Sequence, residues 1–344
     1  TVVNSCNLAC SYCYEHHKDG ARMTFETATA IIERHLNSES TDYDEVEIDL
    51  FGGEPFVNFP LMREICEYTW ARRWKKPYLF FATTNGTLVH GAIRDWVYAN
   101  RHHFFLGLSL DGTPQMHNIN RSNSFEKIDI DFFRECWPNQ AVKMTLSRET
   151  LPDLAVGVIF IHSLGFEIHN NPAYGIDWSS PENVAIFERE VGKLIEYYLE
   201  HPEIKPCSLL DMPLAYIGYT PKKWCGVGVE MAVYGHDGVR YPCHSFLPVS
   251  VGDEKSAASQ SLDFTDTEKL VDPKCVNCLL YNICATCYGS NYAVSGDIAI
   301  RDPHICIFTR MRAAANSYFL AQRILRGQAI PDHSSQDRLV DAIL

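Results

Sequence analysis

The chain has 344 residues, of which 46% are hydrophobic, and a formal net charge of -13 at pH 7. This length allows a full hydrophobic core and predicts two domains rather than a small disulfide-stapled protein. The acidic balance argues against a nucleic-acid backbone as the main partner, because that role calls for a basic surface. No apolar run approaches the roughly 20 residues that span a bilayer, so we expect a soluble protein without a membrane segment.

The cysteine content indicates the compartment. Thirteen cysteines, several in Cys-x-x-Cys spacing and without a secretory signal, predict a reducing interior in which thiolates serve as metal ligands. We therefore expect a cytoplasm that is low in oxygen. The chain begins at Thr1, and only residues 1–5 remain for a first strand before the first cysteine. We expect that a segment upstream has been removed, which could have included a leader-binding domain.

Three cysteines near the amino terminus, Cys6, Cys10 and Cys13, lie within eight residues of one another. Three thiolates on one loop hold only three irons of a four-iron cluster, so one iron stays open to a ligand that is not protein. A zinc knuckle or a disulfide framework is the alternative. The CxxxCxxC spacing, with Tyr12 and Tyr14 flanking the last cysteine, resembles the signature of the radical S-adenosylmethionine (AdoMet) superfamily. In that family the amino and carboxylate groups of AdoMet fill the open position.

A second motif, Gly52-Gly53-Glu54-Pro55, follows a run at 46–51 that alternates acidic with apolar residues, as a half-buried strand does. Paired glycines at a strand end allow the backbone to approach a ligand closely, and the proline constrains the exit from the turn. By the same resemblance, this segment meets the amino group of AdoMet.

Strand-like and helix-like segments alternate up to about residue 200. This order predicts an α/β fold with a parallel sheet and right-handed crossovers, and the resemblance implies a partial (β/α)6 TIM-like barrel over residues 1–204. The predicted strands are 46–51, 78–84, 104–110, 142–147 and 166–169.

Further cofactor contacts are expected where these strands end, because ligands of such sheets gather at the carboxyl ends of the strands. Asn85 follows the strand at 78–84, and Ser109 and Asp111 lie at the end of the strand at 104–110. These segments resemble cofactor-contacting segments of the family, as does the segment 117–121, in which Arg121 would meet the AdoMet carboxylate. Ordinary turn chemistry explains the Asn-Gly and Asp-Gly pairs equally well.

Seven more cysteines lie between residues 225 and 306. Their spacing resembles the cysteine-rich SPASM extension of peptide-modifying radical enzymes, and it predicts a second domain over 205–344 that ends in a helix. The spacing departs from the family pattern once, because only two residues separate Cys284 from Cys287 where three are usual.

The resemblance implies two auxiliary clusters, and therefore three [4Fe-4S] clusters in all. The set of cysteines for the first auxiliary cluster, given below, is one protein ligand short. Cys207 is the nearby cysteine that could supply the fourth ligand, and otherwise the site is open to water or a substrate thiol. Two structural zinc sites are the alternative, but seven ligands do not make two closed four-ligand sites without Cys207 or a histidine. The assigned ligands are Cys225, Cys243 and Cys287 for the first auxiliary cluster, and Cys275, Cys278, Cys284 and Cys306 for the second.

Three local features complete the expected structure. A hairpin is predicted over 231–241 with Gly238 in its turn. Asp302, followed by proline, predicts the start of a helix. Cys66 and Cys136 follow helical apolar spacing and are predicted to be buried core cysteines.

The resemblance implies a reaction in which the first cluster passes one electron to AdoMet, which cleaves to methionine and a 5′-deoxyadenosyl radical. The implied partners are a precursor peptide and an electron donor such as flavodoxin or ferredoxin. Our first hypothesis is a maturase that abstracts a hydrogen from a ribosomally synthesised peptide and forms an intramolecular crosslink, most simply a cysteine thioether. An auxiliary cluster would accept the surplus electron.

The nearest alternative is an anaerobic sulfatase-maturing, formylglycine-generating enzyme. That family places an aspartate base directly after the cysteine that closes the hairpin, whereas here His244 follows Cys243. His244 is therefore a candidate for proton transfer, while His16 and His17 are expected in a solvated loop. Carbon-carbon crosslinking or epimerisation of a peptide also remains open, as does a non-radical iron-sulfur protein for electron transfer or sensing.

Overall fold

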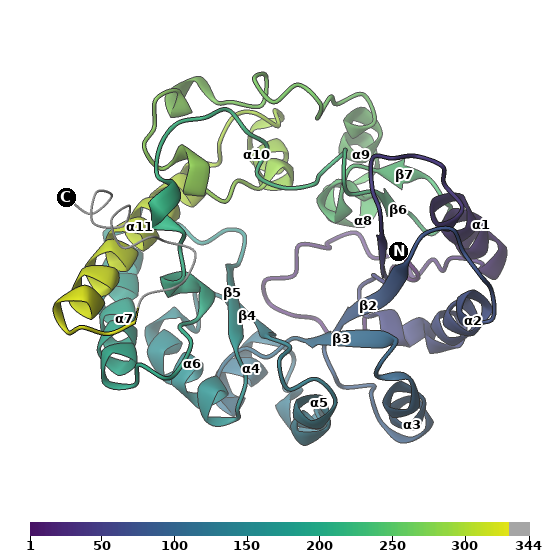
Figure 1. Cartoon of the computed structure of the whole chain (residues 1–344), viewed down its shortest axis with the longest axis horizontal. Helices are drawn as coiled ribbons and strands as arrows, with labels where there is room; N and C mark the ends of the chain where they lie inside the picture. The colour runs from purple at the N-terminus through teal and green to yellow at the C-terminus, as the bar shows by residue number, and fades with distance from the viewer. Residues whose placement is uncertain (330–344) are drawn as a thin grey trace. The chain divides into compact units, whose positions relative to one another are not determined.

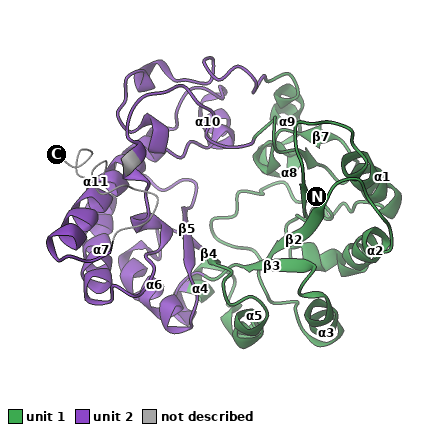
Figure 2. Cartoon of the chain, viewed as in Figure 1, with its two compact units in different colours: residues 1–110, 117–143, 227–262 green, residues 111–116, 144–226, 263–344 purple. Residues whose placement is uncertain are grey.

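The computed structural model describes residues 1–329 of this α/β chain (Figure 1). The chain forms two compact units that interleave along the sequence (Figure 2). Unit 1 comprises residues 1–110, 117–143 and 227–262, and unit 2 comprises 111–116, 144–226 and 263–344. The boundary near residue 204 stays a prediction, and the last part of the predicted second domain, 330–344, lies outside the described residues.

Parallel strands form the central sheet of unit 1, in the order β1-β2-β3. Phe80 of β2 pairs with Ile48 of β1 on one side and with Phe104 of β3 on the other. A parallel bridge between Ser109 and Lys143 connects the end of β3 to β4, so the expected α/β class with parallel strands is confirmed. The strands are β1 (Val46–Asp49), β2 (Tyr78–Thr84), β3 (Phe104–Leu108), β4 (Val142–Leu146), β5 (Ile168–Pro172), β6 (Val233–Tyr234) and β7 (Arg240–Tyr241).

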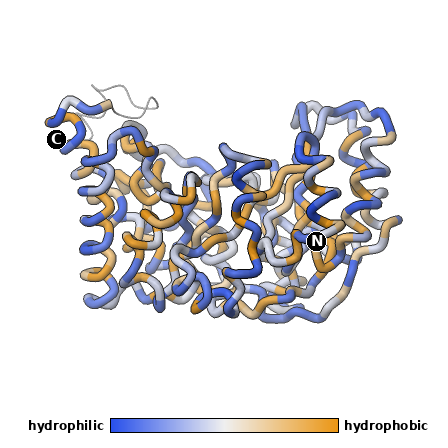
Figure 3. Tube along the Cα trace, turned by 90° about the horizontal axis from the view of Figure 1, so that it is seen from below, coloured by the Kyte–Doolittle hydropathy of each residue, from blue (hydrophilic) through white to orange (hydrophobic). Residues whose placement is uncertain are grey.

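Amphipathic helices follow the strands, and hydrophobic and hydrophilic residues alternate along them (Figure 3). The apolar face of α7 is buried from Phe187 to Leu199. The helices are α1 (Phe25–Leu36), α2 (Phe59–Trp70), α3 (Gly91–Asn100), α4 (Pro114–Asn120), α5 (Ile130–Cys136), α6 (Leu154–Ser163), α7 (Pro181–Glu200), α8 (Pro248–Val251), α9 (Asp253–Ser259), α10 (Tyr288–Ser295) and α11 (Pro303–Leu325). Short 3-10 helices are η1 (Pro55–Asn58), η2 (Phe125–Lys127), η3 (Leu151–Asp153), η4 (Ser208–Leu210), η5 (Leu214–Tyr216), η6 (His244–Phe246), η7 (Pro273–Cys275) and η8 (Tyr281–Ile283).

The sheet of unit 1 has two different faces. On one face, alternate residues such as Phe80, Ala82 and Leu106 are buried. On the other face, Thr83 and Lys143 are half-buried. This alternation follows from the two-residue repeat of a strand, and it leaves polar side chains on the less buried face.

Only β2 has its predicted bounds, because β1, β3 and β4 end one or two residues before the predicted ends at 51, 110 and 147. Residues 1–5 form no continuous strand; instead Val3 makes single bridges with Gly52 and Arg22. β5 covers 168–172 rather than the predicted 166–169, and it begins later because the Phe166 N–H donates to the Ile161 carbonyl at 3.4 Å and so closes the end of α6.

The hairpin and the helix start were predicted correctly. β6 and β7 pair antiparallel, and Gly238 in their turn has φ +81°. Asp302 caps α11, where its side chain accepts from the His304 N–H at 2.9 Å. Cys66 is buried in α2 as predicted, but Cys136 is only half-buried, because it is the last residue of α5.

Candidate iron-sulfur and cofactor site

The cysteine loop of unit 1 is held by the end of α4 and the turn that follows it. The Ser11 N–H donates to the Asn120 carbonyl at 2.9 Å, and the Ala9 N–H donates to Ser122 Oγ at 3.0 Å. Ser122 has φ +57°, an unfavourable backbone conformation for a residue with a Cβ, which indicates that the surrounding contacts define this turn. All three cysteines of the loop are half-buried and none is in a disulfide, so the loop presents the thiols while its backbone is anchored.

The paired glycines bring two segments of the chain together. The Gly53 N–H donates to the Val3 carbonyl at 3.3 Å, and the Glu54 N–H donates to the Ser5 carbonyl at 3.0 Å. A Cβ on Gly53 would lie 2.6 Å from the Ser5 oxygen and 3.0 Å from Cys6 Cβ. The glycines therefore allow the residues before Cys6 to lie directly against this turn, which is a contact within the protein that the sequence did not reveal.

Glu54 connects the ends of two strands. Its side chain, only 1% exposed, accepts from the Thr84 hydroxyl and from the Asn85 N–H, each at 2.8 Å. Burial raises the pKa of this carboxyl to about 7. Because both carboxyl oxygens have partners within the protein, the carboxyl contributes to the site by fixing the turn that contains Asn85.

Asn85 lies beside the first cysteine. Its Nδ2 donates to Asn7 Oδ1 at 3.0 Å and lies 3.9 Å from Cys6 Sγ. Asn7 in turn donates to Thr87 Oγ1 at 2.8 Å. The turn after β2 is therefore connected to the cysteine loop by a chain of amide and hydroxyl groups, as the parallel sheet predicts for segments at one edge.

Arg121 lies over the ring of Tyr12, with its guanidinium carbon 5.4 Å from the ring centroid, and is 8% exposed. Ser109 is also buried at this edge, where its N–H donates to the Thr84 carbonyl at 2.9 Å. Asp111 belongs to unit 2, in which its Oδ1 accepts from the Thr145 N–H at 2.9 Å. Unit 1 thus contains every predicted AdoMet contact except Asp111.

His244 in η6 lies among aromatic rings of unit 1. Its ring centroid is 5.7 Å from that of Tyr14 and 5.4 Å from that of Phe51, the residue before the paired glycines. Burial, and then the charge of Lys143, lower the pKa of His244 to about 4, so the imidazole is neutral at pH 7. His16 and His17 are exposed, as expected for a solvated loop.

The sequence interpretation missed two residues at the cysteine loop. Lys18 Nζ lies 3.0 Å from Cys13 Sγ and donates to the Glu15 carbonyl at 2.7 Å. The signal that could have revealed them is an acidic and a basic residue three positions apart, directly after the third cysteine.

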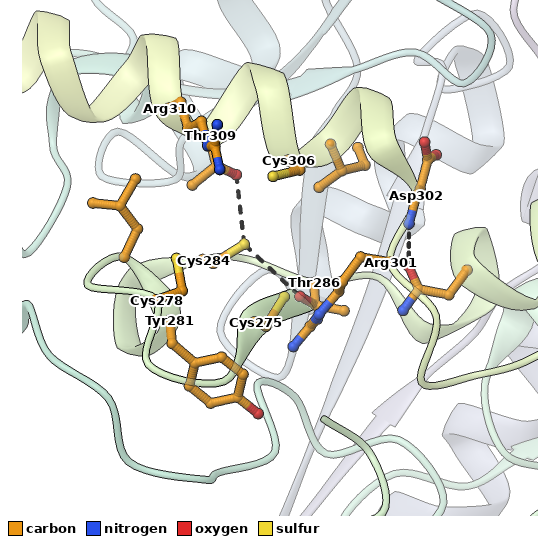
Figure 4. Close-up of a pocket in the computed structure, with 13 residues that line it drawn as sticks. Cys275, Cys278, Tyr281, Cys284, Thr286, Arg301, Asp302, Cys306, Thr309 and Arg310 are labelled. Carbon is orange, nitrogen blue, oxygen red and sulfur yellow. Dashed lines mark hydrogen bonds between the residues drawn. The ribbon is translucent and has the colours of Figure 1, made fainter. Parts of the chain in front are cut away.

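Four cysteines of unit 2 surround one pocket, between the 3-10 turns η7 and η8 and the first turn of α11 (Figure 4). They are the four that the sequence assigned to the second auxiliary cluster. Cys284 Sγ lies 3.7 Å from Thr309 Oγ1 and 3.9 Å from Thr286 Oγ1. The pocket is lined by Cys275, Cys278, Cys284 and Cys306 together with Tyr281, Arg301 and Asp302.

The other groups of this pocket fit an anionic cluster. Arg301 lines it, and among the described residues its buried Nε and Nη1 atoms have no hydrogen-bond partner. Burial raises the pKa of the Cys275 thiol, and the neighbouring Arg301 opposes this effect. A cluster with four thiolate ligands would supply the negative charge and the sulfur acceptors that these N–H groups lack.

The cysteines assigned to the first auxiliary cluster belong to both units. Cys243 is buried in unit 1, whereas Cys225 is exposed in unit 2. Cys287, also in unit 2, accepts from the Ser290 N–H at 3.4 Å and lies 3.3 Å from the Tyr174 hydroxyl. Their grouping stays a prediction, as does the participation of the fully buried Cys207, whose thiol pKa is raised by burial.

Within residues 1–329, no group of three or more His, Cys, Asp or Glu side chains is arranged to hold a single metal ion. A zinc ion would need thiolates about 2.3 Å from one common centre, whereas a four-iron cluster spreads its ligands over four corners. The absence of such a group in residues 1–329 therefore argues against a bound single ion but not against a cluster. In the same residues, no helix is both long and apolar enough to cross a membrane.

Comparison with known proteins agrees with this geometry. A family model described as a 4Fe-4S single cluster domain matches residues 1–126. A cysteine-type anaerobic sulfatase-maturating enzyme of Clostridium novyi is 22% identical over 320 residues, which cover 82% of this chain and 84% of that enzyme. The chain spans only 30% to 46% of the length of five other curated relatives.

Solved structures show the same fold. The enzyme anSMEcpe with bound AdoMet has a TM-score of 0.71 at 18% identity, over 99% of this chain and 96% of that one. This chain therefore has the fold of anSMEcpe. Streptococcus suis SuiB, solved with its precursor peptide SuiA, has a TM-score of 0.55 at 14% identity, over 88% of this chain and 74% of SuiB.

Proposed function

We propose that this chain is a radical AdoMet enzyme that abstracts a hydrogen from a ribosomally synthesised precursor peptide and closes a cysteine thioether crosslink. Such a crosslink forms one carbon-sulfur bond and breaks one C–H and one S–H bond, so it releases a hydrogen atom, a proton and an electron. The observation that carries the proposal is the cysteine pocket of unit 2, because an oxidised product needs an electron acceptor near the substrate.

The residues of the cysteine loop would bind the first cluster and AdoMet. Cys6, Cys10 and Cys13 would hold three irons of a [4Fe-4S] cluster, and AdoMet would occupy the fourth. Together these groups supply the carbon radical that takes a hydrogen atom from the peptide. Arg121, buried over the Tyr12 ring, is suited to the carboxylate of AdoMet.

Other residues at the same edge would complete the cofactor site. We propose that Gly52 and Pro55 shape the turn that faces the AdoMet amino group, and that Asn85 and Ser109 contact the cofactor from the ends of β2 and β3. Asp111 remains a proposed contact from unit 2. Tyr14 would limit solvent access beside the third cysteine.

The enzyme would carry three [4Fe-4S] clusters, two of them auxiliary. In unit 2, the four cysteines around the pocket would close one auxiliary cluster completely. The set of Cys225, Cys243 and Cys287 would hold the other with one iron short of a ligand, and a substrate thiolate could bind there. Cys207 is the alternative ligand. An external donor such as flavodoxin or ferredoxin would reduce the clusters.

His244 separates this proposal from formylglycine formation. The sulfatase-maturing family has an aspartate base after the corresponding cysteine, whereas this chain has a buried imidazole whose pKa is lowered to about 4 and which is therefore neutral rather than anionic at pH 7. We propose that neutral His244 accepts a hydrogen bond from the substrate thiol and assists its deprotonation when the thiol approaches iron. The Tyr14 and Phe51 rings would hold this imidazole in place.

Sulfatase maturation is the second candidate, and one observation favours it. The C. novyi sulfatase-maturating enzyme matches this chain over most of both sequences. In that case the chain would convert a cysteine of a protein substrate into an aldehyde, and another group would replace the aspartate base.

Mass analysis distinguishes the two candidates. The anaerobically reconstituted enzyme is incubated with AdoMet, a reductant and cysteine-containing peptides, and the products are sequenced by tandem mass spectrometry. Thioether formation gives a peptide lighter by two hydrogen atoms per crosslink. An aldehyde that reacts with a hydrazide probe would support sulfatase maturation instead, and a crosslink that forms equally well in a cysteine-free peptide would exclude the thioether.

The role of His244 has its own test. The variant His244→Ala should still cleave AdoMet but give less crosslinked peptide, because the thiol loses its hydrogen-bond partner. His17→Ala, which changes an exposed histidine, is the matched control and should leave the yield unchanged. An undiminished yield in His244→Ala would exclude the proton-transfer role.

A further inference from the structure

Lys18 is the cation in direct contact with a sulfur atom of the cysteine loop. Its Nζ lies 3.0 Å from Cys13 Sγ, within the hydrogen-bond range for a sulfur acceptor. The same ammonium donates to the Glu15 carbonyl at 2.7 Å and lies 3.5 Å from the Glu15 carboxylate. The ammonium thus has two hydrogen-bond acceptors and one ion-pair partner, and one of the acceptors is a proposed cluster ligand.

Burial of the contact makes it electrostatically significant. The Glu15 side chain is 6% exposed and that of Lys18 is 24% exposed, so bulk water screens this charge only in part. The Glu15 main chain and side chain both hold the ammonium, and Lys18 is thereby kept within reach of Cys13. An exposed lysine without such contacts would move freely and would act on the cluster only weakly.

A positive charge at this position affects the two oxidation states of a cluster differently. Reduction of a [4Fe-4S] cluster from the 2+ to the 1+ state adds one electron, so the thiolate-ligated reduced form carries the larger negative charge. Hydrogen bonds to ligand sulfur and nearby cations stabilise that form more, and hydrogen bonding to the sulfurs is one of the factors that set cluster potentials.

We propose that Lys18 is a positioning residue for the AdoMet-binding cluster: its ammonium donates to the Cys13 thiolate and makes the one-electron reduction of that cluster easier. The inference rests on the proposed assignment of Cys13 to this cluster. It assigns Glu15 the part of anchoring Lys18, and it predicts a property of the cluster that exists before any substrate binds.

The test is a redox titration of the full chain. Wild-type protein and Lys18→Met are reconstituted anaerobically and titrated with a low-potential reductant, and the cluster spectrum that changes upon addition of AdoMet identifies the N-terminal cluster. Lys18→Met removes the charge and the donor but retains the length of the side chain. Its midpoint potential should be more negative than that of the wild type, and Lys18→Arg should restore most of the difference.

Lys75→Met is the matched control. Lys75 is an exposed lysine that pairs with Glu39, away from the described contacts of the cysteine loop. The same chemical change at Lys75 should leave the potential unchanged. A shift of equal size in Lys75→Met would show a general effect of net charge and would overturn the proposal.

The outcomes separate this inference from the proposed function. A full iron and sulfide content in Lys18→Met with an unchanged potential overturns the role of Lys18 and leaves the cluster assignment intact. Absence of an AdoMet-responsive cluster in the wild type contradicts the proposed function itself. If Lys18→Met does not incorporate the cluster, the titration is done with Lys18→Gln instead. The amide of this variant keeps a neutral donor but not the charge, so its midpoint potential should be more negative than that of the wild type, by less than a variant without a donor would show. A wild-type potential in Lys18→Gln would overturn the proposal.

Discussion

The two cysteine sites of this chain are built in different ways. At the amino terminus, three cysteines lie on one short loop, and hydrogen bonds from the end of α4 and from the turn after β2 hold that loop. In unit 2, four cysteines come from η7, from the segments directly before and after η8, and from the first turn of α11, and they surround one pocket. A single loop supplies too few ligands for a four-iron cluster, whereas the pocket supplies a complete set.

Because of this difference, the cysteine loop is suited to binding a reactant, and the pocket of unit 2 is suited to storing electrons. A site that lacks one protein ligand can bind a small molecule at its open iron, while a site with all its ligands can only exchange electrons. The pocket of unit 2 also contains Arg301, whose unpaired N–H groups match a fixed negative charge. At the loop, the corresponding cation is Lys18, which contacts Cys13.

Removal of a loop cysteine should have the largest effect. Cys10→Ala leaves two thiolates, so the N-terminal cluster should be lost, with roughly four irons fewer per chain, and AdoMet cleavage should stop. Iron analysis and chromatography of 5′-deoxyadenosine measure both. The control Cys66→Ala removes a buried cysteine of α2, and this variant should keep the iron content of the wild type. Continued AdoMet cleavage by Cys10→Ala would contradict the assignment of Cys10 to the cluster.

Removal of a pocket cysteine should affect the product but spare AdoMet cleavage. Cys306→Ala opens the second auxiliary site, so iron should again fall by roughly four per chain. The formation of 5′-deoxyadenosine should persist while the yield of modified peptide drops, because the electron acceptor is impaired. Cys136→Ala is the control with a half-buried cysteine outside the pocket. If Cys306→Ala lost AdoMet cleavage to the same extent as Cys10→Ala, the distinction between the two cysteine sites would be refuted.

The buried Glu54 predicts a pH dependence. Its pKa of about 7 lies above the 4.5 of the unfolded chain, so the folded protein binds this proton more tightly. Stability should therefore fall as the pH rises from 4.5 to 7, by up to about 3 kcal/mol from this group. Thermal unfolding of wild type and Glu54→Gln at several pH values measures it. Glu54→Gln should lack this part of the decrease in stability with rising pH. If the stabilities of the two proteins changed in parallel with pH, the raised pKa of Glu54 would be refuted.

The smallest expected effect concerns the paired glycines. Gly53→Ala would place its Cβ 2.6 Å from the Ser5 carbonyl oxygen, so the protein should lose about 1–3 kcal/mol of stability and bind AdoMet less tightly. Gly192→Ala in α7, where a Cβ meets no atom within 4 Å, should be neutral or stabilising by roughly 0.5–1 kcal/mol. Denaturant unfolding measures the stability of both variants. Equal stability of Gly53→Ala and Gly192→Ala would contradict the close approach of the Gly53 turn to Ser5.

The sequence predicted those parts of the fold and site that depend on local pattern. The strand at 78–84 was predicted to the residue, because its apolar run ends in the turn of Asn85. The cap of α11 by Asp302 and the hairpin turn at Gly238 are likewise local. The resemblance of the cysteine pattern to the SPASM extension also implied the set of four thiols that surround one pocket.

Features that depend on contacts between distant segments could not be predicted. The start of β5 shifted because the Phe166 N–H closes α6, and no periodicity shows which hydrogen bond a residue will make. The glycine turn proved to lie against Ser5, although the sequence suggested only a ligand there. Lys18 looked like any surface lysine, since its contact with Cys13 depends on the path of the loop.

The most direct test of the central claim is the formation of 5′-deoxyadenosine. Anaerobically reconstituted protein is reduced in the presence of AdoMet, and the nucleoside is quantified beside the iron and zinc content. The account predicts iron, not zinc, at the loop, with 5′-deoxyadenosine formed by the wild type and absent in Cys10→Ala. A wild-type protein with its full iron content and no 5′-deoxyadenosine above background would contradict it.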